Sequence, residues 1–151
     1  MTETATWQQL ADAEPELAER VRSCFGIRRH ATMATLRRDG APRISGTEVA
    51  FTGEGQLEVG SMSGARKALD LQRDPRVALH SPTVDLPPGD PAGWAGEAKV
   101  SGVVEELARG DGGSHVFRVH LSSAVHTAVQ GDELVVTLWR AGVGTEQMRR
   151  S

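Results

Sequence analysis

The chain has 151 residues, with 17 lysines and arginines against 20 aspartates and glutamates, and a formal net charge of -3. This length predicts one domain with its own core, and the acidic balance argues against a nucleic-acid partner, because phosphate binding needs a surplus of basic residues. The single cysteine, Cys24, leaves no internal disulfide, and no secretory signal or membrane-spanning run is found, so we expect a cytoplasmic protein with no membrane partner.

An amphipathic helix is predicted over residues 14–25. Apolar side chains recur there at helical spacing, Pro15 suits the first turn, and Gly26 is typical of a helix end. We therefore expect an N-terminal helical segment, residues 1–29, in front of a single β-rich domain, residues 30–151.

Short strands separated by turns are predicted for most of the remaining chain. Two β-rich runs, 30–37 and 43–51, flank the turn signal Asp39-Gly40 and predict a hairpin, which a third strand over 56–62 extends into a meander. Further strands are expected over 76–84, 97–107, 115–121, 124–129 and 133–139, and the tail 140–151 is expected to be polar and irregular. About six or seven strands at this spacing predict a closed or nearly closed antiparallel β-barrel.

One short helix and one long loop interrupt the predicted strands. The helix lies in GARKALDLQRD, with Ser63 as its expected N-cap and Asp74-Pro75 at its end. The loop, residues 85–96, is rich in proline and glycine. With Trp94 at its tip it is a candidate lid or substrate wall, and an ordinary surface loop is the alternative.

Three histidines lie on the predicted strands without a metal-ligand pattern. If one strand ran through His115, His120 and His126, the first would face opposite to the other two, and no cysteine joins them. No nucleophile elbow, phosphate-binding P-loop or zinc-protease motif is present either. We therefore expect no metal site and assign no catalytic residue.

The start of the short helix carries two cations, Arg66 and Lys67. The chain has only two lysines, the other being Lys99, to which we assign no anion. Cations in a first helical turn oppose the helix dipole at a cost of about 0.3–1 kcal/mol each, which a phosphate bound at the same place would offset. A solvated basic face is the alternative interpretation.

Two further features suit a flat, anionic ligand. Arg43 and Ser45 share one face of the second strand, and Gly46 permits close approach of a planar ring, although an ordinary edge strand explains the same pattern. Trp139 precedes a tail that contains Arg149, and a large ring beside a cation suits such a ligand. A tryptophan that packs the core or a dimer face is the alternative.

A family resemblance connects these features. The succession HATMATLRRDGAPRISGTEVAF, LEVGSMSGARKALDLQRDPRVALHS and EAKVSGVVEEL resembles the pyridoxamine 5'-phosphate oxidase-like flavin and deazaflavin oxidoreductases, which have a split β-barrel fold. It covers roughly residues 30–107, with weaker similarity in the C-terminal strand. The resemblance implies a homodimer that binds FMN, or the related deazaflavin coenzyme of the F-420 type, in two clefts at the subunit interface.

The resemblance also implies a set of cofactor contacts. They are Arg43, Ile44 and Ser45 on the second strand, Gly60 and Ser61 on the third, Arg66 and Lys67 at the phosphate, and Trp139 and Arg149 near the ring.

The chain departs from the oxidase at several positions. Thr145 and Gln147 stand where the oxidase has an arginine and a histidine for its pyridoxal substrate, and Glu97 replaces a polar amide. Glu48 stands where a lysine borders the flavin, and a carboxylate there opposes an anionic reduced flavin. We therefore do not expect true pyridoxamine phosphate oxidation.

These observations predict a flavin- or deazaflavin-dependent oxidoreductase that transfers a hydride between the bound cofactor and a small organic substrate. The protein would supply phosphate anchoring, ring orientation and a pocket. Two alternatives stay open: a non-catalytic flavin- or haem-binding protein of the same fold, and a structural dimer whose cofactor site has degenerated.

Overall fold

The structure is a computed structural model that describes residues 2–108 and 111–151. Its α-helices are α1 (Trp7–Ala13), α2 (Pro15–Phe25) and α3 (Arg66–Arg73). Its strands are β1 (Ala31–Leu36), β2 (Pro42–Thr47), β3 (Val49–Phe51), β4 (Leu57–Ser61), β5 (Arg76–His80), β6 (Glu97–Glu106), β7 (His115–Gln130), β8 (Glu133–Arg140) and β9 (Gly144–Arg150).

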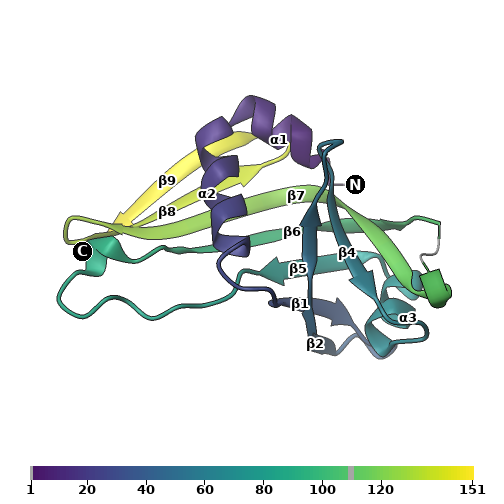
Figure 1. Cartoon of the computed structure of the whole chain (residues 1–151). Helices are drawn as coiled ribbons and strands as arrows, with labels where there is room; N and C mark the ends of the chain where they lie inside the picture. The colour runs from purple at the N-terminus through teal and green to yellow at the C-terminus, as the bar shows by residue number, and fades with distance from the viewer. Residues whose placement is uncertain (1, 109–110) are drawn as a thin grey trace.

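One antiparallel sheet contains all of these strands. Its order is β2-β1-β5-β6-β7-β4-β3, with β8 paired to β7 and β9 paired to β8. The N-terminal part of β7 pairs with β4 and its C-terminal part pairs with β8, so the sheet branches at this strand. Figure 1 shows β7 along the length of the molecule, with β8 and β9 at one end and α3 at the other. The predicted antiparallel, mainly β architecture with few helices is confirmed.

The expected count of six or seven strands is wrong, because the described residues form nine. The expected strand 43–51 divides at Glu48, where the chain leaves β1 as its partner and continues as β3 beside β4. The expected irregular tail instead forms β9, because a turn at Gly142, with φ +76°, folds it back onto β8. Every residue of β9 is exposed, so its sequence shows no alternation of apolar and polar residues.

The first hairpin is confirmed, whereas the meander is wrong. β1 and β2 pair antiparallel around the Asp39-Gly40 turn, in which Gly40 has φ +88°. β4 does not extend this hairpin but pairs with β3 and β7. Long-range pairing therefore places β4 toward the other end of the sheet order from β2, and the two strands approach each other without pairing.

A bulge in β7 changes the expected orientation of its histidines. The chain pairs Ser123 with Ser101 and Leu121 with Gly102, which leaves Ser122 as an extra residue. An extra residue shifts the alternation of side chains by one position. His115 and His126 are therefore both buried, and the expectation that they face opposite ways is wrong. Among the described residues, no group of three or more metal-ligating side chains is found.

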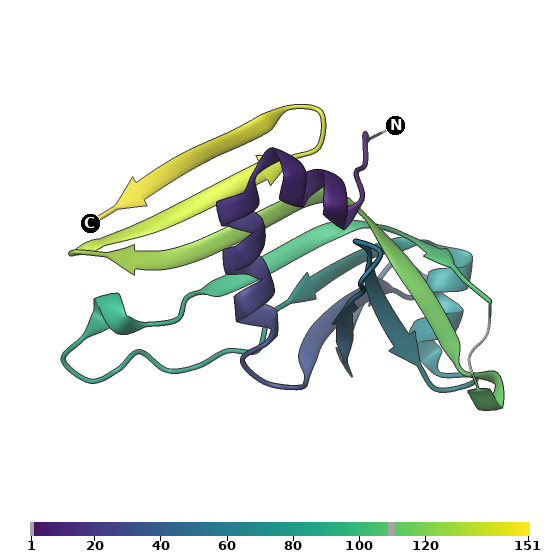
Figure 2. The ribbon, with the colours of Figure 1, turned by 45° about the horizontal axis from the view of Figure 1, so that its top comes forward.

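Two helices cover one face of the sheet. α2 matches the predicted helix, and α1 is an addition that begins with a capping box: Thr6 Oγ1 accepts from the backbone N–H of Gln9, and Gln9 Oε1 accepts from that of Thr6. Trp7 packs against Phe51 with ring centroids 4.6 Å apart. Figure 2 shows α2 crossing β7 and β6. The core thus contains side chains from both the helices and the sheet.

The third helix begins later than expected. Ala65 is its N-cap and provides no side-chain cap, so the prediction of Ser63 in this role is wrong. Gly64 lies between them with φ +72°, a left-handed conformation that turns the chain before the helix starts. None of the helices in the described residues is long and apolar enough to cross a membrane.

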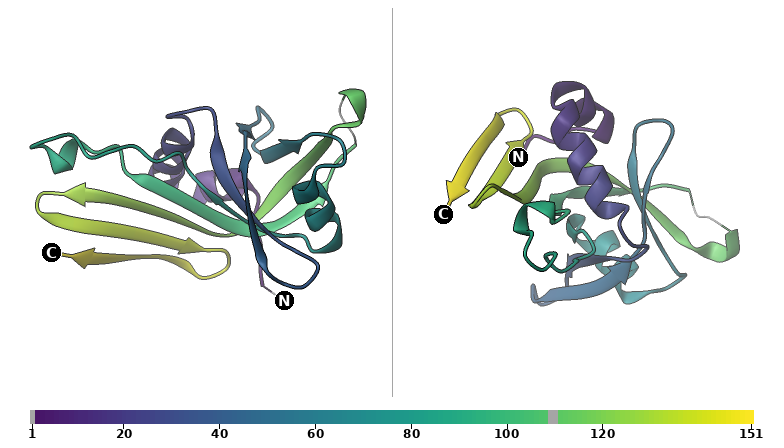
Figure 3. Two further views of the ribbon diagram at one scale, coloured as in Figure 1. Left: turned by 90° about the horizontal axis from the view of Figure 1, so that it is seen from below. Right: turned by 60° about the vertical axis from the view of Figure 1, so that its left-hand side comes forward.

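The predicted loop between β5 and β6 is confirmed. It contains only a single 3-10 turn, Pro91–Gly93, and Trp94 Nε1 donates to the carbonyl oxygen of Val84 at 3.0 Å. Figure 3 shows this loop at the same end of the molecule as β8 and β9, away from α3.

Candidate functional site

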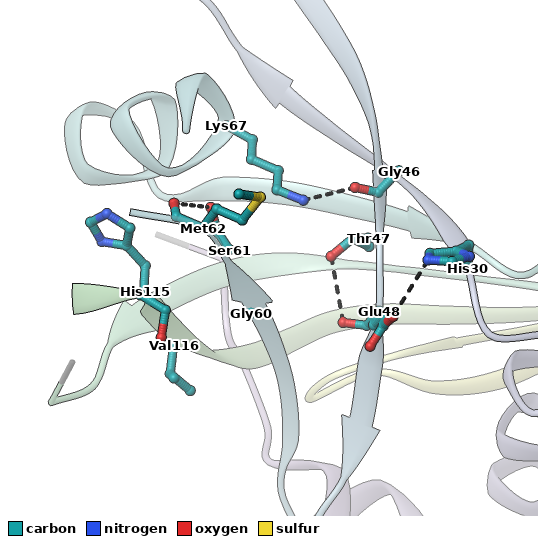
Figure 4. Close-up of a pocket in the computed structure, with 11 residues that line it drawn as sticks. His30, Gly46, Thr47, Glu48, Gly60, Ser61, Met62, Lys67, His115 and Val116 are labelled. Carbon is teal, nitrogen blue, oxygen red and sulfur yellow. Dashed lines mark hydrogen bonds and ion pairs between the residues drawn. The ribbon is translucent and has the colours of Figure 1, made fainter. Parts of the chain in front are cut away.

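A cavity of about 480 Å³ opens between β2, β4 and the start of α3. Figure 4 shows these elements converging on it, with Lys67 reaching across from the helix. Its lining residues are His30, Gly46, Thr47, Glu48, Gly60, Ser61, Met62, Lys67, Ser114, His115 and Val116.

Lys67 supplies positive charge to this cavity. Its Nζ donates a hydrogen bond to the carbonyl oxygen of Gly46 at 2.7 Å, which joins α3 to β2. Within residues 2–108 and 111–151, no carboxylate forms an ion pair with Lys67, and burial lowers the pKa of its ammonium group. The first turn of α3 also has no acidic residue and no side-chain cap. The start of this helix therefore lacks the negative groups that usually stabilise such a position.

Two glycines leave space in the cavity wall. A Cβ atom built at Gly46 would meet no atom within 4 Å, and one at Gly60 would meet only the carbonyl oxygen of His115 at 3.8 Å. Neither glycine has a positive φ, so their backbone conformations do not require glycine. Their missing side chains keep this part of the cavity open to a flat or close-lying group.

A buried carboxylate fixes α3 against the sheet beneath the cavity. Asp70 Oδ2 accepts from Thr35 Oγ1 at 2.7 Å and from Arg43 Nε at 2.6 Å. Burial by itself raises the pKa of this carboxyl, but hydrogen bonds from Arg43 and Thr35 and the charge of Arg43 hold it below its usual value. Arg43 is therefore held by Asp70 and does not line the cavity.

A second carboxylate lies at the other end of the cavity. Glu48 Oε1 lies 3.5 Å from Arg29 Nε and 3.4 Å from His30 Nε2. Figure 4 shows His30 on the other side of the β2 ribbon from Lys67, with Glu48 at the ribbon between them. The cavity thus has a cationic end at α3. Its other end, at the start of β1, carries both acidic and basic side chains and is largely exposed.

The structure brings three of the nine predicted cofactor residues into this cavity: Gly60, Ser61 and Lys67. The other six lie elsewhere in the chain. Arg66 is exposed on α3, Arg43 bonds Asp70, Ser45 is partly buried on β2, Ile44 is exposed on that strand, Trp139 is buried in the core, and Arg149 lies 3.7 Å from Glu133. Their contacts with a cofactor stay predictions.

Sequence reasoning missed His30 and His115 as lining residues. His30 directly precedes β1, and His115 is the first residue of β7. Neither stands in a local motif, since the pairing of β4 with the start of β7 is what brings His115 beside Ser61. Only that long-range register would have indicated its role.

The outer face of the sheet carries an apolar depression of about 480 Å³ on β2, β1, β5 and β6. Ile44 projects there with 75% of its surface exposed. The other lining residues include Ala34, Ala78 and Lys99.

Comparisons with known proteins establish the fold. No protein-family model and no curated protein sequence matches the chain. Among solved structures, it is similar to a pyridoxamine 5'-phosphate oxidase-related, FMN-binding protein from Nostoc punctiforme PCC 73102, with 9% identity, a TM-score of 0.64, and coverage of 91% of this chain and 96% of that one.

Two further solved structures are similar with lower TM-scores. A heme-binding protein from Mycobacterium smegmatis has 14% identity, a TM-score of 0.56, and coverage of 90% of this chain and 88% of that one. An F420 reductase has 18% identity, a TM-score of 0.52, and coverage of 69% of this chain and 94% of that one. The chain therefore has the split β-barrel fold of the pyridoxamine 5'-phosphate oxidase-like proteins, as its sequence predicts.

Proposed function

We propose that the cavity holds the phosphate end of FMN or of a deazaflavin coenzyme, and that the protein is an oxidoreductase acting on a small organic substrate. The observation that carries this proposal is Lys67, a partly buried cation with no carboxylate partner among the described residues, in a cavity walled by Gly46 and Gly60. The similar structures include an FMN-binding protein and an F420 reductase, which supports a flavin-type ligand.

The residues of the cavity fit such a group. Lys67 and the neighbouring Arg66 would bind the phosphate, since charge-assisted hydrogen bonds to an anion are the strong ones. Gly46 and Gly60 would let the rest of the cofactor lie against the strands. The bound flavin or deazaflavin would supply the hydride chemistry.

The other end of the cavity carries groups that exchange protons. Glu48 and His30 both line the cavity, with Glu48 Oε1 3.4 Å from His30 Nε2, and a carboxylate and an imidazole are side chains that commonly act as acid or base. In this proposal they hold a proton for the substrate, whereas Lys67 binds and orients the phosphate of the cofactor.

We also propose a homodimer that forms through the outer face around Ile44. An isoleucine with 75% of its surface exposed in an apolar depression is typical of a surface that another chain covers. A second copy on this face would lie close to the cavity, because Ile44 on that face and Gly46 in the cavity wall belong to the same strand.

The proposed ligand is tested by titrating the protein with FMN and measuring the change in flavin fluorescence. Replacing Arg66 and Lys67 together by alanine is expected to weaken binding by roughly 2–5 kcal/mol, because two charge-assisted contacts to one anion are removed. Arg140→Gln is the control, since it removes a cation from the exposed end of β8. Unchanged FMN affinity in the double variant would place the phosphate elsewhere.

A haem-binding protein is the alternative, which the similarity to a heme-binding protein favours. Haem needs an axial ligand, and both ring nitrogens of His115 have partners in Glu106 and Gly64. This leaves His30 as the one lining histidine for that role among the described residues. A Soret band on addition of haem, lost in His30→Ala, would support the alternative, and flavin fluorescence quenching without such a band would support the flavin.

A further inference from the structure

The loop Met62–Ala65, which leads from β4 into α3, is held by a histidine from a distant part of the chain. The backbone N–H of Gly64 donates to His115 Nε2 at 3.2 Å. His115 is the first residue of β7, and only 2% of its surface is exposed. Among the described residues, it is the one side chain distant in sequence that hydrogen-bonds to this loop.

The contacts of His115 define its tautomer. Because an amide N–H can only donate, Nε2 must be the unprotonated ring nitrogen. Nδ1 then carries the proton and donates to Glu106 Oε2 at 2.8 Å. Gln72 Nε2 donates to the other oxygen of Glu106 at 2.8 Å, so this carboxylate connects β6, α3 and β7. A ring fixed by a carboxylate on one nitrogen is an oriented acceptor at the other.

We infer that His115 positions the anion-binding start of α3, an inference that rests on the proposed function of the cavity. Lys67 follows Gly64 by three residues, and α3 has no side-chain cap of its own to fix where it begins. A Cβ built at Gly64 meets no atom within 4 Å, so side-chain packing does not hold this residue in place. The hydrogen bond to His115 therefore ties the loop to β7 and, together with the Asp70 contacts that hold α3 against the sheet, sets where Arg66 and Lys67 are presented.

His115 is a positioning residue in this scheme. Both of its ring nitrogens are engaged, by Gly64 and by Glu106, so it has no free nitrogen for a ligand. Its effect on binding passes through the loop and reaches the phosphate end of the cavity. The affinity for a ligand that has the flavin ring but no phosphate should therefore not change when His115 is replaced.

Two substitutions separate the two contacts of His115. In His115→Gln, the amide oxygen can take the place of Nε2 and accept from Gly64. In His115→Asn, the shorter amide can take the place of Nδ1 and donate to Glu106, but it does not reach Gly64. Both variants lose part of the buried ring, so a purely structural role would affect them alike.

The first measurement needs no ligand. Hydrogen exchange of the Gly64 amide, followed by NMR in the full-length protein, is expected to be at least several-fold faster in His115→Asn than in the wild type. In His115→Gln it should stay near the wild-type rate. Equal exchange rates in both variants would overturn the inference, whatever the protein binds.

The second measurement compares FMN with riboflavin, which has the same ring and ribityl chain and no phosphate. His115→Asn is expected to weaken FMN binding about tenfold, as for the loss of one hydrogen bond, with riboflavin affinity unchanged and with His115→Gln near the wild type. An equal loss for both ligands would overturn the positioning role. If neither ligand binds the wild type, the proposed function fails, and the amide exchange still decides the role of His115.

Discussion

Replacing Asp70 by alanine tests the buried network beneath the cavity. The substitution removes an acceptor whose side chain is 4% exposed and leaves Arg43 Nε and Thr35 Oγ1 without their partner. Removing one partner of a buried ion pair costs about 3–5 kcal/mol. Because the Arg43 side chain keeps 21% exposure and can turn partly to water, we expect the low end, about 3 kcal/mol.

The contribution of Asp70 should also depend on pH in one direction. Its pKa in the folded protein lies below the ordinary value of 3.8, so the folded state binds a proton less readily than the unfolded state. The stability that the carboxylate contributes is therefore fully present above pH 3.8 and is lost as the pH falls through the lowered pKa. The difference between the wild type and Asp70→Ala should be constant near neutral pH and should shrink in acid.

Urea unfolding followed by circular dichroism at a series of pH values measures both effects. Asp132→Ala is the matched control, because this carboxylate lies exposed in the turn between β7 and β8, and its loss should change stability by no more than about 0.5 kcal/mol. A loss below about 1 kcal/mol for Asp70→Ala, or a loss that does not shrink in acid, would refute the argument that Arg43 is held by a buried ion pair.

Three further predictions concern other parts of the molecule. Gly60→Val should lower FMN affinity at least tenfold by filling the cavity, with the midpoint of urea unfolding unchanged. Wild-type affinity in this variant would show that FMN does not bind beside β4. Ile44→Glu should turn a dimer into a monomer in sedimentation equilibrium, and a monomeric wild type would contradict the dimer. Burial and the charge of Glu97 raise the pKa of the Cys24 thiol to about 11, so a thiol reagent at pH 8 should react far more slowly in the native protein than in urea.

Local signals in the sequence were sufficient to predict an element whose bounds are set by its own residues. Pro15 and Gly26 delimit α2, and Asp39-Gly40 places the first hairpin. α1 was missed although its signal was present, since Thr6 and Gln9 have the spacing of a capping box. A search for that pattern in the first ten residues would have found it.

The errors in strand order and side-chain orientation come from pairing between distant segments. Whether β4 continues the first hairpin or crosses to β7 depends on which strand edges are available, and no local pattern encodes that choice. The bulge at Ser122 likewise depends on the register between β6 and β7, and without it the alternation placed His115 and His126 on opposite faces of the strand. The structure brings Gly60, Ser61 and Lys67, which lie close together in the sequence, into one cavity, and the start of β7 completes that cavity without a local signal. Whether these residues contact a cofactor stays a prediction.

The electrostatics of the chain single out Lys67 on physical grounds. Other cations that are partly buried in the described residues have carboxylate partners, such as Arg43 with Asp70 and Arg118 with Glu58 at 3.6 Å. Lys67 instead gives up part of its hydration for one backbone carbonyl, at a helix start where a positive charge is already unfavourable. A charge placed against both its hydration and the helix dipole is expected mainly at functional sites, where a bound ligand can offset the cost. An anion bound at this helix start would satisfy the ammonium group and the free first-turn amides together, and a neutral ligand would satisfy neither.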